Sequence, residues 1–207
     1  MKKDIEKYSI AGHLSRVFDK KKRPIAFTAK NKEDINRWKN ITRRKLKELI
    51  GYNEFERCNP APKNNEKTDF PEYTRFHMEI KTEPDVLMPF YVLKPKIKKD
   101  KYNCVIALHG HGSGGKYSVA GRSDIPEISE AIKQYNYDYG TQFVREGFLV
   151  FCPDARGFGE RQEKWARNNI LNSSCLWINN MAIPLGMTIT GMWTWDIHRL
   201  IDYIQTR

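Results

Sequence analysis

A glycine-rich turn that directly follows a short apolar run is the feature that most constrains the fold. Residues 103–110 read NCVIALHG, and residues 108–118 continue as LHGHGSGGKYS. A continuous apolar run of this length is typical of a strand buried on both faces, and glycines after it allow a tight reversal of the chain. FLVFCPD, at 148–154, is a second run of the same kind. Strands of this type, separated by helices, predict an α/β fold with a mostly parallel sheet.

The first third of the chain predicts one helix and a connector. Residues 31–50 keep apolar side chains three to four positions apart, Asn31 is a suitable N-cap, and Gly51 is a suitable terminator. Residues 58–72, rich in proline and asparagine, predict a surface loop. We therefore expect residues 1–72 to form a helical and loop extension.

Residues 73–207 predict the α/β domain itself. Two strand-like runs within 76–95, separated by Glu83-Pro84-Asp85, predict an antiparallel hairpin before the first buried strand. Residues 139–146 predict a short helix, which would flank the sheet. A final helix is indicated by apolar residues on one face: Trp193, Ile197, Leu200, Ile201 and Ile204.

Three glycine motifs overlap at the turn. Gly110, Gly112 and Gly115 match the GxGxxG pattern of dinucleotide binding, and Gly110 to Lys116 match a phosphate loop without its final Ser or Thr. His109 followed by Gly110, after an apolar strand, matches the His-Gly turn that positions oxyanion donors in many hydrolases.

The residues after the turn favour the hydrolase interpretation. Both nucleotide motifs need a helix that begins directly at the glycines, but Gly121 and Pro126 interrupt any helix there. Tyr117 stands where a phosphate loop needs a small hydroxyl for Mg²⁺. A nucleotide site at Gly110–Lys116 remains an alternative, as does a merely flexible loop.

In the hydrolase interpretation, glycines let a substrate carbonyl approach main-chain amides, because they carry no Cβ. Gly110 and Gly112 would form this oxyanion turn, and the amide of His111 would be one donor. We expect the His111 side chain itself to be exposed.

Four segments resemble, in order, the landmarks of α/β-hydrolases of the dienelactone-hydrolase and acetyl-xylan-esterase type. They are TEPDVLMPFYVLKP, VIALHGHGSGG, GFLVFCPDARGFGER and WDIHRLIDYI. The resemblance implies a serine hydrolase of carboxylic esters, with the His111 amide in the oxyanion hole. It also implies a loop-organising role for His109, Asp154 and Arg156, and we expect Asp154 to tie the loop to Arg156.

The chain departs from this family in one respect: no serine or cysteine lies in a GxSxG-type elbow. The nucleophile, the triad acid and the triad histidine are therefore expected to be absent from these residues. The chain reads as the N-terminal portion of an esterase that is inactive alone, and the nucleophile elbow onward is missing. A non-catalytic α/β interaction module is an alternative.

Charge and composition narrow the partners. The formal net charge of +11 lies entirely in residues 1–101. The lysine-rich stretches lack interleaved aromatics, which argues against a nucleic-acid-binding protein.

No apolar run approaches the length of a membrane span, and no secretory signal begins the chain, so a cytoplasmic protein is expected. The cysteines form no CxxC pair, and we expect no metal or cofactor. The expected partners are a small ester, such as an acetylated sugar, for the parent protein, and a second copy through an exposed sheet edge.

Overall fold

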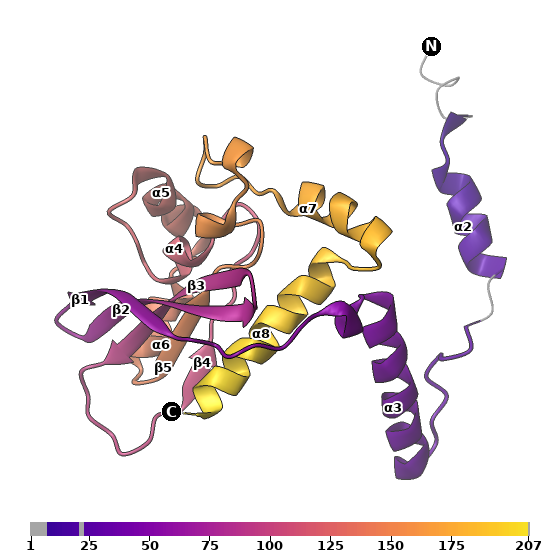
Figure 1. Cartoon of the computed structure of the whole chain (residues 1–207), viewed down its shortest axis with the longest axis horizontal. Coiled ribbons are helices and arrows are strands. Elements are labelled where there is room, and N and C mark those ends of the chain that lie inside the picture. Colours follow the sequence, from indigo (N-terminus) through magenta and orange to yellow (C-terminus); the bar gives the residue numbers. More distant parts are fainter. Residues whose placement is uncertain (1–7, 21–22, 207) are drawn as a thin grey trace. The chain divides into compact units, whose positions relative to one another are not determined.

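The computed structural model describes residues 8–20 and 23–206 (Figure 1). The chain divides into two compact units, Met1–Leu46 and Lys47–Arg207. This boundary lies earlier than the predicted one between residues 72 and 73. Residues 47–72 therefore belong to the unit that contains the sheet.

The first unit contains α2 (Ala11–Lys20) and most of α3 (Lys32–Leu49). The predicted helix over 31–50 is confirmed as α3, and Asn31 caps it, because its Oδ1 accepts a hydrogen bond from the Asp34 amide at 2.9 Å. Trp38 anchors the preceding segment through a 2.9 Å bond from its Nε1 to the Ile25 carbonyl.

The second unit is built on a five-stranded sheet of order β1-β2-β3-β5-β4. The bounds are β1 Lys63–Asp69, β2 Tyr73–Glu83, β3 Val86–Pro95, β4 Cys104–Ile106 and β5 Leu149–Pro153. Pairs β1/β2, β2/β3 and β3/β5 are antiparallel, and only β4/β5 is parallel. The prediction of a mostly parallel sheet is therefore wrong, since the hairpin gains a third strand and joins β5 in the antiparallel sense.

The missed strand is β1. Its sequence, KNNEKTD, has no apolar alternation and its residues are almost all exposed, because it lies at the edge of the sheet. Backbone pairing with β2 forms the strand, from Lys63 opposite Glu79 to Asp69 opposite Thr74. The predicted surface loop over 58–72 is wrong for this segment, because a sequence pattern cannot show where a partner strand offers hydrogen bonds.

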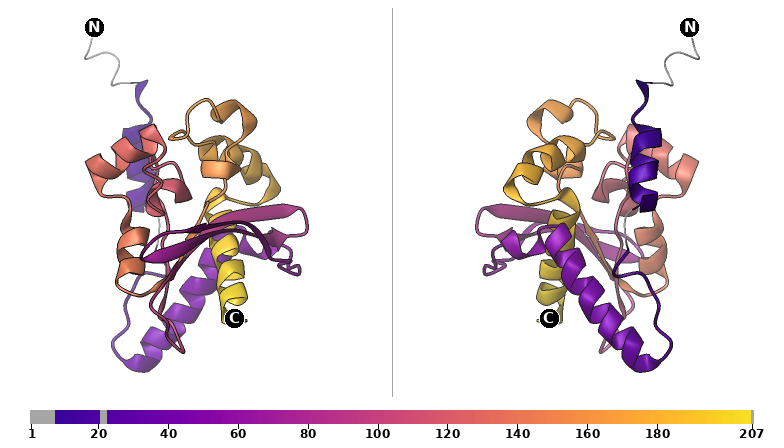
Figure 2. Two further views of the ribbon diagram at one scale, coloured as in Figure 1. Left: turned by 90° about the vertical axis from the view of Figure 1, so that its left-hand side faces the viewer. Right: turned by 90° about the vertical axis from the view of Figure 1, so that its right-hand side faces the viewer.

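Helices cover both faces of the sheet (Figure 2). Between β4 and β5, the chain forms α4 (Lys116–Val119), α5 (Pro126–Tyr135) and α6 (Tyr139–Arg145). After β5 come short turns, then α7 (Cys175–Ala182) and α8 (Ile189–Gln205). The short helical turns are η2 (Tyr52–Glu54), η3 (Gly159–Arg161), η4 (Lys164–Ala166) and η5 (Ile183–Leu185).

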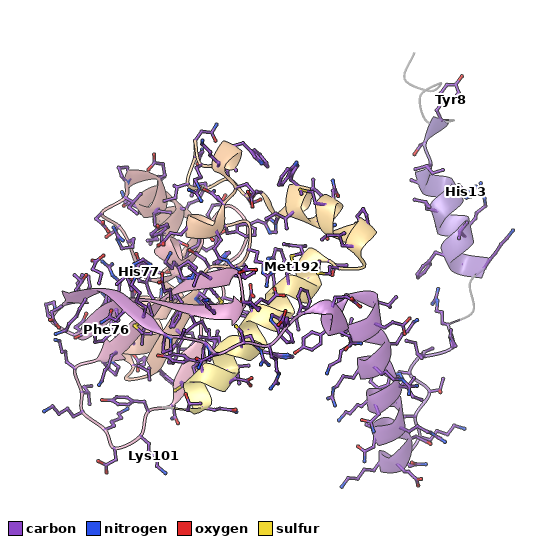
Figure 3. The ribbon with its side chains drawn as sticks, viewed as in Figure 1. Tyr8, His13, Phe76, His77, Lys101 and Met192 are labelled. Atoms are coloured by element: carbon purple, nitrogen blue, oxygen red, sulfur yellow. The ribbon has the colours of Figure 1, made fainter. Side chains whose placement is uncertain are left out.

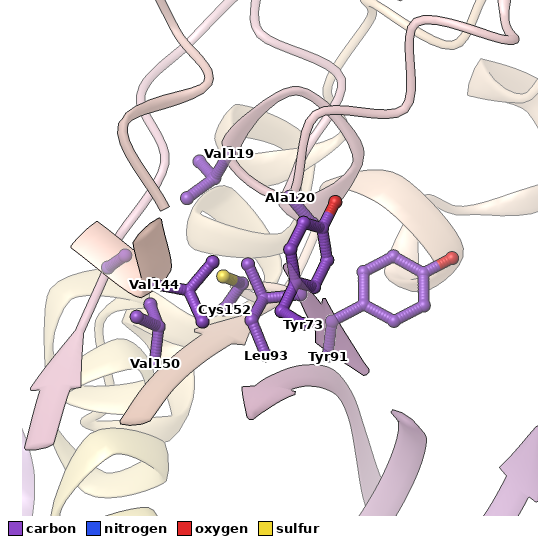
Figure 4. Packing of buried hydrophobic residues seen from close by; sticks show 9 residues of the cluster. Tyr73, Tyr91, Leu93, Val119, Ala120, Val144, Val150 and Cys152 are labelled. Carbon is purple, nitrogen blue, oxygen red and sulfur yellow. The ribbon is translucent and has the colours of Figure 1, made fainter. Parts of the chain in front are cut away.

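Alternate residues of β3 and β5 supply two separate cores. On one face, Val150 and Cys152 pack with α4 and α6, and Figure 4 shows this cluster. On the other face, Phe151 packs with Phe90 and with Leu200 of α8. The period-two alternation of β5 thus holds a helix layer on each side.

The hairpin, β5, α6 and α8 are confirmed as predicted. The strand predicted over 103–110 is not buried on both faces: β4 has only three residues, and they are exposed or half-buried. β4 lies at the sheet edge, where no described strand covers its outer side. No helix within the described ranges is both long and apolar enough to cross a bilayer.

Candidate functional site

The glycine turn and the loop after β5 lie at the same edge of the sheet. Because β4 and β5 are parallel, their carboxyl ends meet there, and the Ala107 amide still bonds the Phe151 carbonyl at 2.8 Å. Beyond this point, the segment after β4 leaves the sheet, whereas β5 continues beside β3 to Pro153. Ligand sites of open α/β sheets lie at such an edge.

The first half of the turn presents free amides. His111 and Gly112 are exposed, and none of the described hydrogen bonds uses either amide as a donor. The Ser113 hydroxyl donates to the Gly110 carbonyl at 2.8 Å, which fixes the bend. A Cβ at Gly110 or Gly112 would meet nothing within 4 Å. The backbone on either side of His111 is therefore uncrowded.

His109 links the turn to the loop after β5. Its Nε2 accepts the Ala155 amide proton at 3.0 Å, and its Nδ1 lies 3.2 Å from the Gly110 carbonyl. Burial lowers the pKa of His109, despite the opposing charge of Asp154. A neutral ring with its proton on Nδ1 satisfies both contacts. His109 therefore contacts both the glycine turn and the loop after β5.

His111 is exposed as a whole residue, and its ring makes specific contacts. The ring packs edge-on against the Phe158 ring, with the two centroids 4.8 Å apart. Its centroid lies 6.4 Å from that of the Trp193 ring. Its Nε2 lies 3.2 Å from Cys175 Sγ. These contacts fix the side chain whose backbone carries the exposed amide.

A buried ion cluster, formed by Lys116, Asp154 and Glu160, links the end of the glycine turn to the loop after β5. The Lys116 ammonium lies 2.6 Å from Asp154 Oδ2 and 2.5 Å from Glu160 Oε1, and the side chains of Lys116 and Asp154 are fully buried. The Asp154 carboxylate also accepts hydrogen bonds from the backbone amides of Lys116 and Glu160, at 2.7 and 3.1 Å. His77 Nε2, on β2 (Figure 3), lies 3.1 Å from the same Glu160 oxygen.

The charges of this cluster stabilise one another. Burial works to lower the pKa of Lys116, but Asp154 and Glu160 outweigh it and raise that pKa. Burial works to raise the pKa of Glu160, but His77 and Lys116 lower it to about 2. At neutral pH, the Lys116 ammonium and the Glu160 carboxylate are therefore both charged.

The expected pairing of Asp154 with Arg156 does not form. Arg156 points to the opposite side of the loop, where it makes a two-pronged contact with Asp196 of α8, at 3.0 and 2.8 Å, and reaches Glu83 at 2.6 Å. Arg161 adds a 2.7 Å bond to Asp196. Burial tends to raise the pKa of Asp196, but the two arginines outweigh it and the pKa is lowered.

Helix α4 begins at Lys116, immediately after the glycines, which the sequence interpretation did not expect. The helix has only four residues, and Gly121 follows it with φ +68°. The Lys116 ammonium is bound by two carboxylates and has no exposure, so it cannot reach a phosphate at the surface. This geometry weighs against the phosphate-loop alternative.

Two hollows flank the turn. A small cavity of about 110 Å³ lies under His109, with Met88 and Pro153 in its wall. An open groove of about 650 Å³ runs along α5 beside His111 and Gly112. Among the described residues, no group of three or more His, Cys, Asp or Glu side chains is arranged to hold a metal ion.

Sequence reasoning missed Lys116, Glu160 and Asp196 as members of the site. Asp196 carried a usable signal, since a carboxylate on an otherwise apolar helix face needs a buried partner. Lys116 and Glu160 carried no such signal. They are far apart in the sequence, and only the fold brings them together.

Comparisons with known proteins yield a structural match alone. No family model matches the chain, and no curated protein matches it by sequence. A solved structure from Bacteroides fragilis NCTC 9343, described as a "putative acetyl xylan esterase", superposes with a TM-score of 0.76 at 18% identity. The match covers 97% of this chain and 51% of that chain. This chain therefore has the fold of about half of that structure.

A second structure, a methylesterase, matches 64% of this chain and 27% of its own, with a TM-score of 0.50 at 21% identity. The chain therefore spans about half the length of the first structure and a smaller share of the second. At these identities, the likeness concerns the fold.

Proposed function

We propose that this chain forms the oxyanion-binding part of a carboxylic-ester hydrolase of the serine α/β-hydrolase type. The observation that carries the proposal is the exposed pair of amides at His111 and Gly112, held open at the carboxyl end of β4. The structural likeness to part of two esterases supports it.

In the proposed reaction, the substrate carbonyl oxygen lies at the turn and becomes negatively charged as a nucleophile attacks the carbonyl carbon. The His111 amide donates to this developing oxyanion, and one such donor lowers the barrier by about 3 kcal/mol. The second donor would be the amide that follows the nucleophile. His109 and the Lys116 cluster position the turn without touching the substrate.

The nucleophile, its histidine base and the acid are not supplied by these 207 residues, which contain no GxSxG elbow. We therefore expect the chain alone to be inactive toward esters. For the parent protein, the proposed substrate is a small carboxylic ester. An acetylated sugar is consistent with the likeness to the acetyl xylan esterase structure.

The gene sequence beyond codon 207 tests the proposal first. An in-frame strand followed by GxSxG within about twenty residues would support it. The second test applies p-nitrophenyl acetate and a fluorophosphonate probe to the purified chain, and we expect neither turnover nor labelling. Steady turnover with a labelled serine would contradict the assignment of the nucleophile to another segment.

A second candidate is a non-catalytic module that associates through β4. Its three residues form the sheet edge, so the outer backbone groups have no described partner strand. Light scattering after size exclusion tests this: the apparent mass should rise with protein concentration. A constant monomer mass up to high concentration would count against it.

The nucleotide alternative has a direct test as well. If Gly110–Lys116 bound a phosphate chain, millimolar ATP or NAD would raise the Tm by ligand linkage. We expect an unchanged Tm, because the Lys116 ammonium is already bound to Asp154 and Glu160.

A further inference from the structure

Cys175, the first residue of α7, lies against the exposed turn. Its Sγ is 3.2 Å from His111 Nε2 and 3.5 Å from the Ser173 hydroxyl. Cys175 is 7% exposed, whereas His111 is exposed. A thiol and an imidazole thus meet within hydrogen-bonding distance, close to the surface of the molecule.

The surroundings of this pair suit thiol chemistry. An imidazole at this distance can take the thiol proton, and free amides in the first turn of a helix stabilise the resulting thiolate. The His111 ring is held in place by Phe158, 4.8 Å away, and by Trp193. A nucleophile in contact with an oriented base is the arrangement that activates thiols in enzymes.

The other three thiols lack such a partner. None of Cys58, Cys104 and Cys152 has a described hydrogen bond to an imidazole, and burial raises the pKa of each. Cys104 is exposed, Cys58 is half-buried and Cys152 is buried. Exposure alone would therefore make Cys104 the most reactive thiol, and a base-assisted thiol would reverse that order.

We propose that Cys175 and His111 form a nucleophilic thiol–imidazole pair, a site for covalent modification by soft electrophiles and by hydroperoxides. With iodoacetamide, an S–C bond forms, iodide leaves, and the thiol proton passes to His111 and then to solvent. With hydrogen peroxide, the sulfur attacks one oxygen and the O–O bond breaks. Cys175 is then oxidised to a sulfenic acid, and the proton from His111 completes the water molecule that leaves. The chemistry of this pair does not depend on the proposed ester hydrolysis, although His111 takes part in both: its ring acts here and its backbone amide acts there.

The first test uses the whole folded chain and its own cysteines as references. Brief treatment with iodoacetamide at pH 6 to 8, followed by peptide mass spectrometry, gives a rate for each thiol. We expect Cys175 to react at least tenfold faster than Cys104 at pH 6, because an unassisted thiol loses tenfold in rate per pH unit below its pKa. A Cys175 rate at or below that of Cys104 would overturn the proposal.

The variant His111→Gln tests the role of the base. It keeps the backbone amide and a side chain of similar size but removes the basic imidazole nitrogen. The alkylation rate of Cys175 should therefore fall at least tenfold at pH 6. Ser173→Ala is the matched control, and it should change the rate less than threefold. An unchanged Cys175 rate in His111→Gln, with unaltered circular dichroism, would also overturn the proposal.

Peroxide treatment provides a separate test of the oxidation step. Dimedone, which traps sulfenic acids, should label Cys175 before Cys104.

Discussion

Replacing Lys116 with methionine tests whether the buried ion cluster holds the turn and the loop after β5 together. The change keeps most of the side-chain volume but leaves Asp154, which has no exposure, without its 2.6 Å counter-charge. At an effective dielectric constant of about 20, two unit charges at that distance attract by roughly 6 kcal/mol. Desolvation offsets part of this attraction in the native protein, and breaking a buried pair typically costs about 3 to 5 kcal/mol.

We expect the lower end of that range, about 3 kcal/mol, because Asp154 would keep two amide donors. Urea unfolding followed by tryptophan fluorescence measures the loss, and the Tm should fall by roughly 6 to 12 °C. Lys96→Met is the matched control. Its ion pair with Asp69 joins two side chains that are about half exposed, 46% and 50%, so the cost should stay below about 1 kcal/mol.

The double variant Lys116→Met/Asp154→Asn isolates the interaction. Removing the stranded charge should recover part of the stability, so the double variant should be more stable than the sum of the two single changes predicts. Strict additivity would refute the reasoning. So would a Lys116→Met cost no larger than that of Lys96→Met.

Three further predictions concern the same region. The pKa of Glu160 is lowered from 4.5 to about 2, so its charge adds stability above pH 4.5 that is lost as the pH falls toward 2. Between these pH values, the free energy of unfolding should therefore fall more steeply in the unsubstituted chain than in Lys116→Met. In urea unfolding, Gly115→Ala should lower the free energy of unfolding several times more than Gly112→Ala, although both glycines have φ near +70°. The reason is that a Cβ at Gly115 would strike an Asp154 oxygen, whereas a Cβ at Gly112 would meet nothing within 4 Å. Equal losses would contradict this. Arg156→Lys should destabilise by about 1.5 to 3 kcal/mol, since lysine cannot make the two-pronged contact with Asp196, and a calorimetric loss under about 0.5 kcal/mol would argue against that role.

The sequence determined the elements whose residues decide their own conformation. Asn31 and the apolar spacing after it specify α3. Alternation on either side of Glu83-Pro84-Asp85 specifies the β2/β3 hairpin, and the continuous apolar run of 148–154 specifies β5. The position of the glycine turn after β4 also followed from the sequence, because local chemistry limits where a chain can reverse.

Tertiary structure alone decided the remainder. β1 exists because β2 offers it hydrogen bonds, although its own sequence, with almost every side chain exposed, gives no signal. The antiparallel character of the sheet follows from the place that β5 takes beside β3. Asp154 binds Lys116 while Arg156 binds Asp196, because the two side chains leave the loop on opposite sides and residues about 40 positions away arrive at each of them. Charge pairing depends on distance in space, and a linear sequence does not contain that distance.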